Sequence, residues 1–234
     1  MKLSIDQRIF ETFEDPQIGV VVVRGADNAG ESAEVVELLR SAEEGVRQAF
    51  VGIDPITTQP NIAVWRKAYK KFGVDPHEYR SSIEALVRRV LKGGAIPHIN
   101  KLVDVYNYIS LKYLVPVGGE DLDAVKGDLA LTFAIGDEQF VRLGGTENEP
   151  PLSGEVIYRD ELGVLCRRWN WREADRTKLT EGTRDAILVI ETLSPIDLAT
   201  VQQATQELAE LVQRHCSART ISFIVNKGNA VIEF

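Results

Sequence analysis

The chain has 234 residues, of which 44% are hydrophobic and 26% are charged, and its formal net charge is −8. No apolar run approaches the roughly 20 residues that cross a bilayer, and the N-terminus lacks the apolar segment of a secretion signal. The acidic balance disfavours tight, unspecific binding to nucleic acid. We therefore expect a cytoplasmic protein with no membrane and no DNA partner.

The first half of the chain predicts helices after one buried strand. Residues 19–24 (GVVVVR) indicate that strand, because they are almost continuously apolar. Ser81 and Glu84 have the spacing of a capping box, and Pro60 suits the first position of a helix. Residues 54–60 are a predicted linker. Apolar residues recur at helical spacing in residues 32–50, 60–72, 82–91 and 99–113.

The second half is predicted to be rich in strands. Short apolar segments alternate with turn signals in residues 129–135, 139–143, 155–160 and 163–168. Residues 186–192 predict a central strand, and Asp197 is expected to cap a helix that ends near residue 215. Residues 220–225 and 230–234 predict a terminal hairpin. The whole order favours an α/β chain of the α+β type, with layered, mixed, mainly antiparallel sheets packed against helices.

Three polar residues share one face of the predicted helix 99–113. Asn100, Asp104 and Asn107 lie at i, i+4 and i+7 on an otherwise apolar segment. A buried polar group without a partner costs about 1–3 kcal/mol. The row therefore lines a wet pocket, a ligand, or a loop whose backbone needs donors and acceptors. Residues 116–121 (PVGGED) follow and predict a tight turn that another molecule can approach.

The familiar catalytic machineries are hard to assemble from this sequence. Among the three histidines, only His98 adjoins the polar helix and is kept as a pocket candidate. Cys166 has no base nearby in sequence, and both cysteines lack metal-ligand and redox spacing, which favours a reducing compartment. No zinc pattern and no phosphate-binding loop is present. We expect no metal and no cofactor.

Basic residues gather in two stretches that also carry tryptophan and tyrosine. Either stretch alone reads as a solvated helix face, whereas the two together favour a surface for phosphates and unstacked bases. In the second stretch the alternative is that Trp169 and Trp171 point into a core while the arginines face solvent. The two clusters are Arg66, Lys67, Lys70, Lys71, Arg80, Arg88, Arg89 and Lys92, and Arg167, Arg168, Arg172, Arg176 and Lys178.

The polar helix and the segment after it carry a family resemblance. The matching positions are Ile99, Asn100, Val103, Asp104, Asn107, Tyr108, Pro116, Asp121, Leu122, Asp123 and Gly127. This pattern resembles the tRNA-editing (B3/B4) module in the β subunit of bacterial phenylalanyl-tRNA synthetase. The resemblance is best over residues 60–195, and it implies one domain over residues 1–234, with residues 1–55 and 196–234 as flanking elements.

The resemblance implies a hydrolase that clears mischarged tRNA. The family cleaves the ester between a wrong amino acid and the terminal ribose with a positioned water, without a metal or covalent nucleophile. The family's pocket asparagine matches Asn107 and its specificity glutamate matches Glu191, and we place Asn100 with them as catalytic candidates. The expected substrate pocket comprises His98, Asp104, Tyr106, Gly118, Gly119, Glu120 and Asp121. The expected tRNA contacts are Arg66, Lys67, Lys70, Arg80, Arg167, Arg168, Trp169, Trp171 and Arg172.

The family's pocket histidine falls on Gly118 in this chain. Convergence of Glu120, Asp121 and Glu191 there makes a roomier, more acidic pocket, which suits a cationic amino acid. The leading hypothesis is a trans-editing aminoacyl-tRNA deacylase with aminoacylated tRNA, and an aminoacyl-tRNA synthetase, as partners. The alternative is a noncatalytic module that binds tRNA or an amino acid, or a protein that docks on a synthetase.

Overall fold

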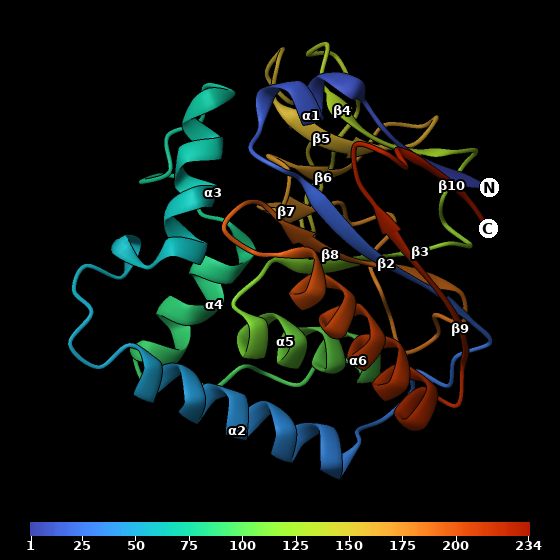
Figure 1. Ribbon diagram of the computed structural model, residues 1–234. Helices are drawn as coiled ribbons and strands as arrows, with labels where there is room; N and C mark the ends of the chain where they lie inside the picture. The colour runs from blue at the N-terminus through green and yellow to red at the C-terminus, as the bar shows by residue number, and fades with distance from the viewer.

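The computed structural model describes residues 1–234 and contains two β-sheets with helices packed around them (Figure 1). The strands are β1 (Lys2–Ile5), β2 (Gln17–Arg24), β3 (Val117–Asp121), β4 (Leu129–Phe133), β5 (Val156–Arg159), β6 (Val164–Arg167), β7 (Arg172–Glu173), β8 (Ala186–Thr192), β9 (Arg219–Val225) and β10 (Val231–Glu233). The helices are α1 (Gln7–Thr12), α2 (Ala33–Ala49), α3 (Pro60–Lys71), α4 (Ser82–Leu91), α5 (Lys101–Tyr113) and α6 (Leu198–Cys216), with a 3-10 turn at Ile56–Thr58.

The four-stranded sheet has the order β3-β8-β2-β9, and all its pairs are antiparallel. Its strands β2 and β8 are covered on both faces, which explains their nearly continuous apolar sequence. Helix α6 lies close against β2 at Gly19, where a Cβ atom would meet Oγ1 of Thr205 at 2.0 Å. The other face of this sheet is directed at the second sheet.

The six-stranded sheet has the order β10-β1-β4-β5-β6-β7. Its one parallel pair is β1 with β4, and the remaining pairs are antiparallel. The prediction of layered, mixed, mainly antiparallel sheets packed with helices is therefore confirmed. Figure 1 shows this sheet above the four-stranded one, with α3 and α4 at the side of both.

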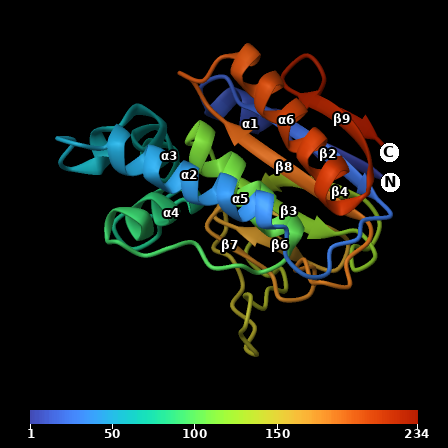
Figure 2. The same ribbon diagram turned by 90° about the horizontal axis from the view of Figure 1, so that it is seen from below.

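Helices α5 and α6 cover the outer face of the four-stranded sheet, and α2 lies outside α5 (Figures 1 and 2). Two of the helices, α4 and α6, begin where side-chain caps were predicted, and α2 begins at a further serine cap. The side chains of Ser32, Ser81 and Asp197 each accept a hydrogen bond from the backbone three residues on. No helix has both the length and the apolar content required to span a bilayer.

Three local predictions are wrong. Strands β9 and β10 do not form a hairpin with each other, because β9 pairs with β2 and β10 pairs with β1 in the other sheet. Residues 139–143 form no strand and contribute a single bridge, from Arg142 to Ala174. The predicted turn at residues 116–121 is largely strand β3, which pairs with β8 along its whole length.

Candidate functional site

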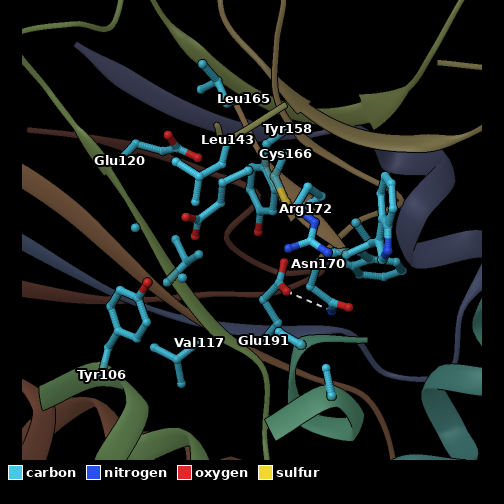
Figure 3. Close-up of a pocket in the computed structure, with 18 of the residues that line it drawn as sticks. Tyr106, Val117, Glu120, Leu143, Tyr158, Leu165, Cys166, Asn170, Arg172 and Glu191 are labelled. Atoms are coloured by element: carbon cyan, nitrogen blue, oxygen red, sulfur yellow. Dashed lines mark hydrogen bonds between the residues drawn. The ribbon is translucent and has the colours of Figure 1, made fainter. Parts of the chain in front are cut away.

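A cavity of about 560 Å³ lies between the two sheets (Figure 3). One wall comes from β3 and β8 of the four-stranded sheet, and the other comes from β1, β4, β5 and β6 of the six-stranded sheet. Helices α4 and α5 contribute residues to the remaining sides. A concave, mostly apolar space with a few polar groups is the usual form of a small-molecule site.

The register between β3 and β8 decides which side chains face the cavity. Gly118 pairs with Val189, and Glu120 pairs with Ile187. Paired residues present their side chains on the same face, and alternate residues of a strand share that face. Glu191 therefore joins Gly118 and Glu120 on the wall that faces the six-stranded sheet.

The opposite wall carries a row of three polar side chains. Tyr158 on β5 pairs with Cys166 on β6, and Cys166 pairs with Glu173 on β7. All three line the cavity. The sequence analysis did not single out Glu173, because β7 has only two residues and carries no periodic pattern. A Cβ atom at Gly118 would lie 3.0 Å from its Oε1, which places the Glu173 carboxyl against β3.

Glu191 is held by a relay of hydrogen bonds. The Tyr69 hydroxyl donates to Oδ1 of Asn170 at 2.9 Å, and Nδ2 of Asn170 donates to Oε2 of Glu191 at 2.8 Å. The first bond fixes which end of the amide faces the carboxyl, and Figure 3 shows the second as a dashed line. The relay orients one oxygen of Glu191 and leaves Oε1 without a partner.

The turn that delivers Asn170 to Glu191 is strained. Arg168 and Trp169 have φ values of 50° and 66°, in the left-handed region that side chains with a Cβ rarely adopt. Each such residue costs of order 1–3 kcal/mol and persists where its surroundings enforce it. Here Trp169 is only 1% exposed and its ring packs on Phe13 and Trp65. The buried tryptophan thus fixes the turn that positions Asn170.

The three carboxyl groups of the cavity hold protons unusually tightly. Burial raises the pKa of Glu191 to about 8, against the hydrogen bond from Asn170. Burial also raises the pKa of Glu173 to about 7. Burial and the nearby charge of Glu173 together raise the pKa of Glu120 well above its usual value. In the empty cavity at neutral pH, Glu191 is mostly protonated and Glu173 is near its titration midpoint.

The Cys166 thiol is an unsuitable nucleophile. Burial raises its pKa well above the ordinary value, and Glu173 adds to this effect. A thiol reacts as its thiolate, which the cavity therefore disfavours.

Several cavity atoms lack a hydrogen-bond partner. The Tyr158 hydroxyl, Oε2 of Glu120 and Oε1 of Glu191 are all buried and unpaired. Each such atom costs about 1–3 kcal/mol when nothing satisfies it. The cavity is therefore suited to a ligand that brings hydrogen-bond donors, and a cation with N–H groups satisfies carboxyl oxygens best.

The exposed charged residues that line the cavity are three arginines and one glutamate, Glu78, so the mouth is mainly cationic. Arg80 and Arg89, from the start and end of the α4 region, and Arg172 on β7 line the opening and are exposed. Arginine pairs with phosphate in a fork of two hydrogen bonds. The site thus joins a cationic rim, which favours polyphosphate chains, to an acidic interior.

The structure brings together part of the predicted pocket. Tyr106, Asn107, Gly118, Gly119, Glu120 and Glu191 line the cavity. His98, Asn100, Asp104 and Asp121 lie outside it, so the prediction that these four line the pocket is wrong.

Each of the excluded polar groups serves the backbone or another side chain. Asn100 caps α5, and its Nδ2 donates to the carbonyl of Leu179. Asp104 accepts from the backbone of Ile99 and hydrogen-bonds Nδ1 of His98. The sequence left open whether the polar helix face lines a pocket, binds a ligand or supports a loop. Asn100 and Asp104 form hydrogen bonds to loops, whereas Asn107 lines the pocket.

Asp121 is turned away from the cavity in the same manner. It accepts a hydrogen bond from Oγ1 of Thr183 and another from the backbone of Asp123. The acidic groups of the cavity were predicted to be Glu120, Asp121 and Glu191. In the structure they are Glu120, Glu173 and Glu191.

The predicted tRNA contacts divide into exposed and buried groups. Lys67 and Lys70 on α3, and Arg80 and Arg172 at the mouth, are exposed. Trp171 is half-buried, and its ring contacts Tyr79 and Arg168. The remaining predicted contacts are buried or nearly so: Arg66, Arg167, Arg168 and Trp169.

Their burial leaves these four side chains little surface to offer to tRNA, and their part in tRNA binding stays a prediction. Arg66 pairs with Glu84, and Arg167 pairs with Glu155. The side chains of both glutamates are at most 1% exposed. The guanidinium of Arg168 lies 3.6 Å from the ring centroid of Tyr79. Sequence alone does not reveal these contacts, because each joins segments that are far apart in the chain.

No group of three or more His, Cys, Asp or Glu side chains is arranged to hold a metal ion.

Comparison with known proteins yields one family match and two relatives. Residues 64–217 match the model of a family described as the B3/4 domain. The phenylalanine–tRNA ligase beta subunit of Photorhabdus laumondii is 27% identical over 113 residues, which cover 48% of this chain and 14% of that protein. A solved N-terminal fragment of the phenylalanyl-tRNA synthetase beta subunit from Pyrococcus horikoshii aligns with a TM-score of 0.47 at 12% identity, covering 95% of this chain and 53% of that one. The chain thus spans a small part of the curated relative.

Proposed function

This chain belongs to the B3/4 domain family, and on that premise we propose that it deacylates mischarged aminoacyl-tRNA in trans. The matched residues 64–217 include α4, α5, β3 and β8, and hence nearly all of the cavity wall. The resemblance drawn from the sequence of residues 99–127 is confirmed by this match. The activity, the substrate and the partners are our proposal.

The pairing of a cationic rim with an acidic interior carries the proposal. The end of a charged tRNA presents phosphates next to an aminoacyl ester, and the ester carries an ammonium group. The rim arginines Arg80, Arg89 and Arg172 suit the phosphates. The interior carboxyls Glu120, Glu173 and Glu191 suit the ammonium group. A ligand of this mixed charge satisfies both parts of the site at once.

The proposed reaction is attack of a water on the ester carbonyl. A bond forms between the water oxygen and the carbonyl carbon, the bond to the ribose oxygen breaks, and the ribose hydroxyl leaves with a proton. We assign Glu191 as the group that accepts the proton of the water. Its pKa of about 8 leaves it protonated in the empty cavity, and the ammonium group of a bound ester favours loss of that proton, after which the carboxylate can act as the base.

Asn107 is assigned to hold the ester in place. It is 9% exposed and lines the cavity from α5. An amide can orient a carbonyl or a water without titrating, and correct placement alone can lower a barrier by several kcal/mol. Asn100, which caps α5 away from the cavity, has no part in this scheme.

The substrate we propose is the ester of a cationic amino acid. The second candidate function is a noncatalytic module that binds tRNA or an amino acid, alone or docked on a synthetase. The observation that favours it is Gly118, which stands where the family resemblance places a histidine.

Deacylation of a panel of aminoacyl-tRNAs tests the proposal. The panel includes tRNAs mischarged with basic and with aromatic amino acids, and the proteins are the wild type, Asn107→Ala and Glu191→Ala. Glu210→Ala, an exposed site on α6, is the matched control. Selective hydrolysis that both cavity variants lose supports the deacylase. Retained tRNA binding without hydrolysis of any species supports the binding module instead.

A further inference from the structure

The acidic groups of the cavity lie in two places. Glu120 and Glu173 approach each other from β3 and β7, and Glu173 lies against Gly118. Glu191 lies on β8 beside Asn170. Figure 3 shows Glu120 and Glu191 as separate groups, with Tyr158 between them in this view.

The strand register gives the spacing of the two places. Gly118, which Glu173 touches, pairs with Val189, and Val189 is two residues from Glu191. At about 3.4 Å per residue, Gly118 lies about 7 Å from Glu191 along the strand, and Glu120, opposite Ile187, lies about 14 Å from it. The shorter spacing, where the Glu173 carboxyl touches Gly118, is close to the separation of the two amino groups in an extended diamino acid such as lysine or ornithine.

The protein itself leaves these carboxyls without a cation. Elsewhere it pairs several deeply buried carboxylates with an arginine, as in Glu84 with Arg66 and Glu155 with Arg167, whereas Asp104 pairs with His98. An unpaired charge inside a protein is costly, so such pairing is the rule. In the cavity, the hydrogen-bond partner of Glu191 is the neutral amide of Asn170. The missing cations must come from a ligand or be replaced by protons.

Unpaired polar atoms mark both places. Oε2 of Glu120 is at one, Oε1 of Glu191 is at the other, and the Tyr158 hydroxyl lies in the same cavity. Glu120 is 9% exposed, Tyr158 7% and Glu191 2%. The Tyr158 hydroxyl and the Trp169 indole are neutral donors near Glu191, so the protein offers this carboxyl hydrogen bonds but no positive charge.

We propose that the cavity binds two ammonium groups at once, one at Glu120 and Glu173 and one at Glu191, and so selects esters of diamino acids. This inference rests on the proposed function for the ester bond, and it names the class of amino acid. An aromatic or aliphatic amino acid supplies one ammonium group and leaves the other acidic place unsatisfied. A buried polar site discriminates strongly against a ligand that leaves it unpaired.

The test uses amides, which keep the charges of the ester and do not hydrolyse in the assay. Calorimetry compares lysinamide, ornithinamide, norleucinamide and phenylalaninamide on the intact protein. Norleucinamide matches lysinamide except for the side-chain ammonium group. We expect both diamino amides to bind at least about tenfold more tightly than norleucinamide, which corresponds to about 1.4 kcal/mol. Equal affinity of lysinamide and norleucinamide overturns the inference, and this comparison needs no variant.

Two variants then locate the ammonium groups. Glu120→Gln and Glu191→Gln should each weaken the binding of lysinamide. The binding of norleucinamide should be weakened by only one of the two substitutions. Glu210→Gln is the exposed control. A lysinamide affinity that neither cavity variant changes overturns the inference.

The same panel separates this inference from the proposed function. Hydrolysis of aromatic esters as fast as lysyl esters keeps the deacylase and overturns the diamino selectivity. Tight binding of lysinamide without hydrolysis of any charged tRNA keeps the selectivity and overturns the deacylase.

Discussion

Gly118 and Glu173 compete for one volume of the cavity, since a Cβ atom at residue 118 would lie 3.0 Å from Oε1 of Glu173. The glycine at residue 118 and the position of the Glu173 carboxyl are therefore structurally linked. Glycine at residue 118, where the family resemblance leads us to expect a histidine, leaves space for the Glu173 carboxyl. Glu173 adds to the acidic character that Glu120 and Glu191 give the cavity.

Gly118→Ala should weaken the binding of cationic ligands. The new methyl group displaces the carboxyl of Glu173, and we expect a loss of about tenfold in lysinamide affinity, or about 1.4 kcal/mol. Stability should change little, because the atom in contact is the end of a flexible side chain. Calorimetry and urea unfolding measure the two effects. Gly182→Ala is the control, since its nearest neighbour would be 3.6 Å away. Unchanged affinity contradicts the role given to Glu173.

Glu191→Gln should flatten the dependence of stability on pH. The pKa of Glu191 is about 8 in the folded protein, against 4.5 for an ordinary glutamate. Between these values the folded state keeps the proton and the unfolded state does not, so the free energy of unfolding falls as pH rises and stays low above 8.

At about 1.4 kcal/mol per pKa unit, the variant should be more stable than the wild type by a few kcal/mol above pH 8. Below about pH 4 both states of the wild type hold the proton, and the difference should vanish. Urea unfolding across this range measures it. For Glu210→Gln, the curve of unfolding free energy against pH should run parallel to that of the wild type. A parallel curve for Glu191→Gln would count against a protonated Glu191.

Binding of a cation should release protons near neutral pH. An ammonium group beside a carboxyl lowers the pKa of that carboxyl, and Glu173 and Glu191 start from about 7 and about 8. Calorimetry of lysinamide in buffers of different ionisation enthalpy counts the protons. The number of protons released should be highest near pH 7. It should decline once the pH exceeds the pKa of Glu191. Glu191→Gln should lower the count. A count that stays at zero at every pH rules out protonated acids at the binding site.

The rim arginines should act on tRNA and not on the amino acid. Replacing Arg80 or Arg172 with glutamine should raise KM for charged tRNA and reduce its dependence on salt, because fewer phosphates are neutralised. Binding of lysinamide should remain within about twofold of the wild type, since the rim arginines repel rather than attract its ammonium groups. Arg184→Gln, at another exposed site, is the control. Equal effects on tRNA and lysinamide would show that these side chains shape the interior.

Local signals in the sequence were sufficient for most of the helices. Ser81 and Asp197 cap helices at the residues where their hydroxyl and carboxylate predict it. The run of apolar residues in β8 is explained by burial on both faces. These features depend on neighbours within a few residues, and such neighbours are visible in the sequence.

Pairing across long distances could not be read from the sequence. The turn at residues 226–229 suggests a hairpin, yet β9 continues the four-stranded sheet and β10 continues the other. Asn100 and Asp104 share a helix face with Asn107, but the loops around residues 99 and 179 take their hydrogen bonds. Glu173 enters the cavity only because two sheets meet there. Sequence predicts which groups need partners, and the fold decides which partners they find.

Cys166 gives the cavity an internal reporter. Its thiol is 8% exposed and lies beside Tyr158 and Glu173, whereas Cys216 is completely buried on α6 with its pKa raised to about 12. At alkaline pH, which offsets the raised pKa of the Cys166 thiol, a small alkylating reagent reaches Cys166 through the cavity and reaches Cys216 only when the protein opens. A ligand in the cavity should slow the labelling of Cys166 and leave that of Cys216 unchanged. Mass spectrometry of the two peptides thus measures occupancy of the site, even where no reaction occurs.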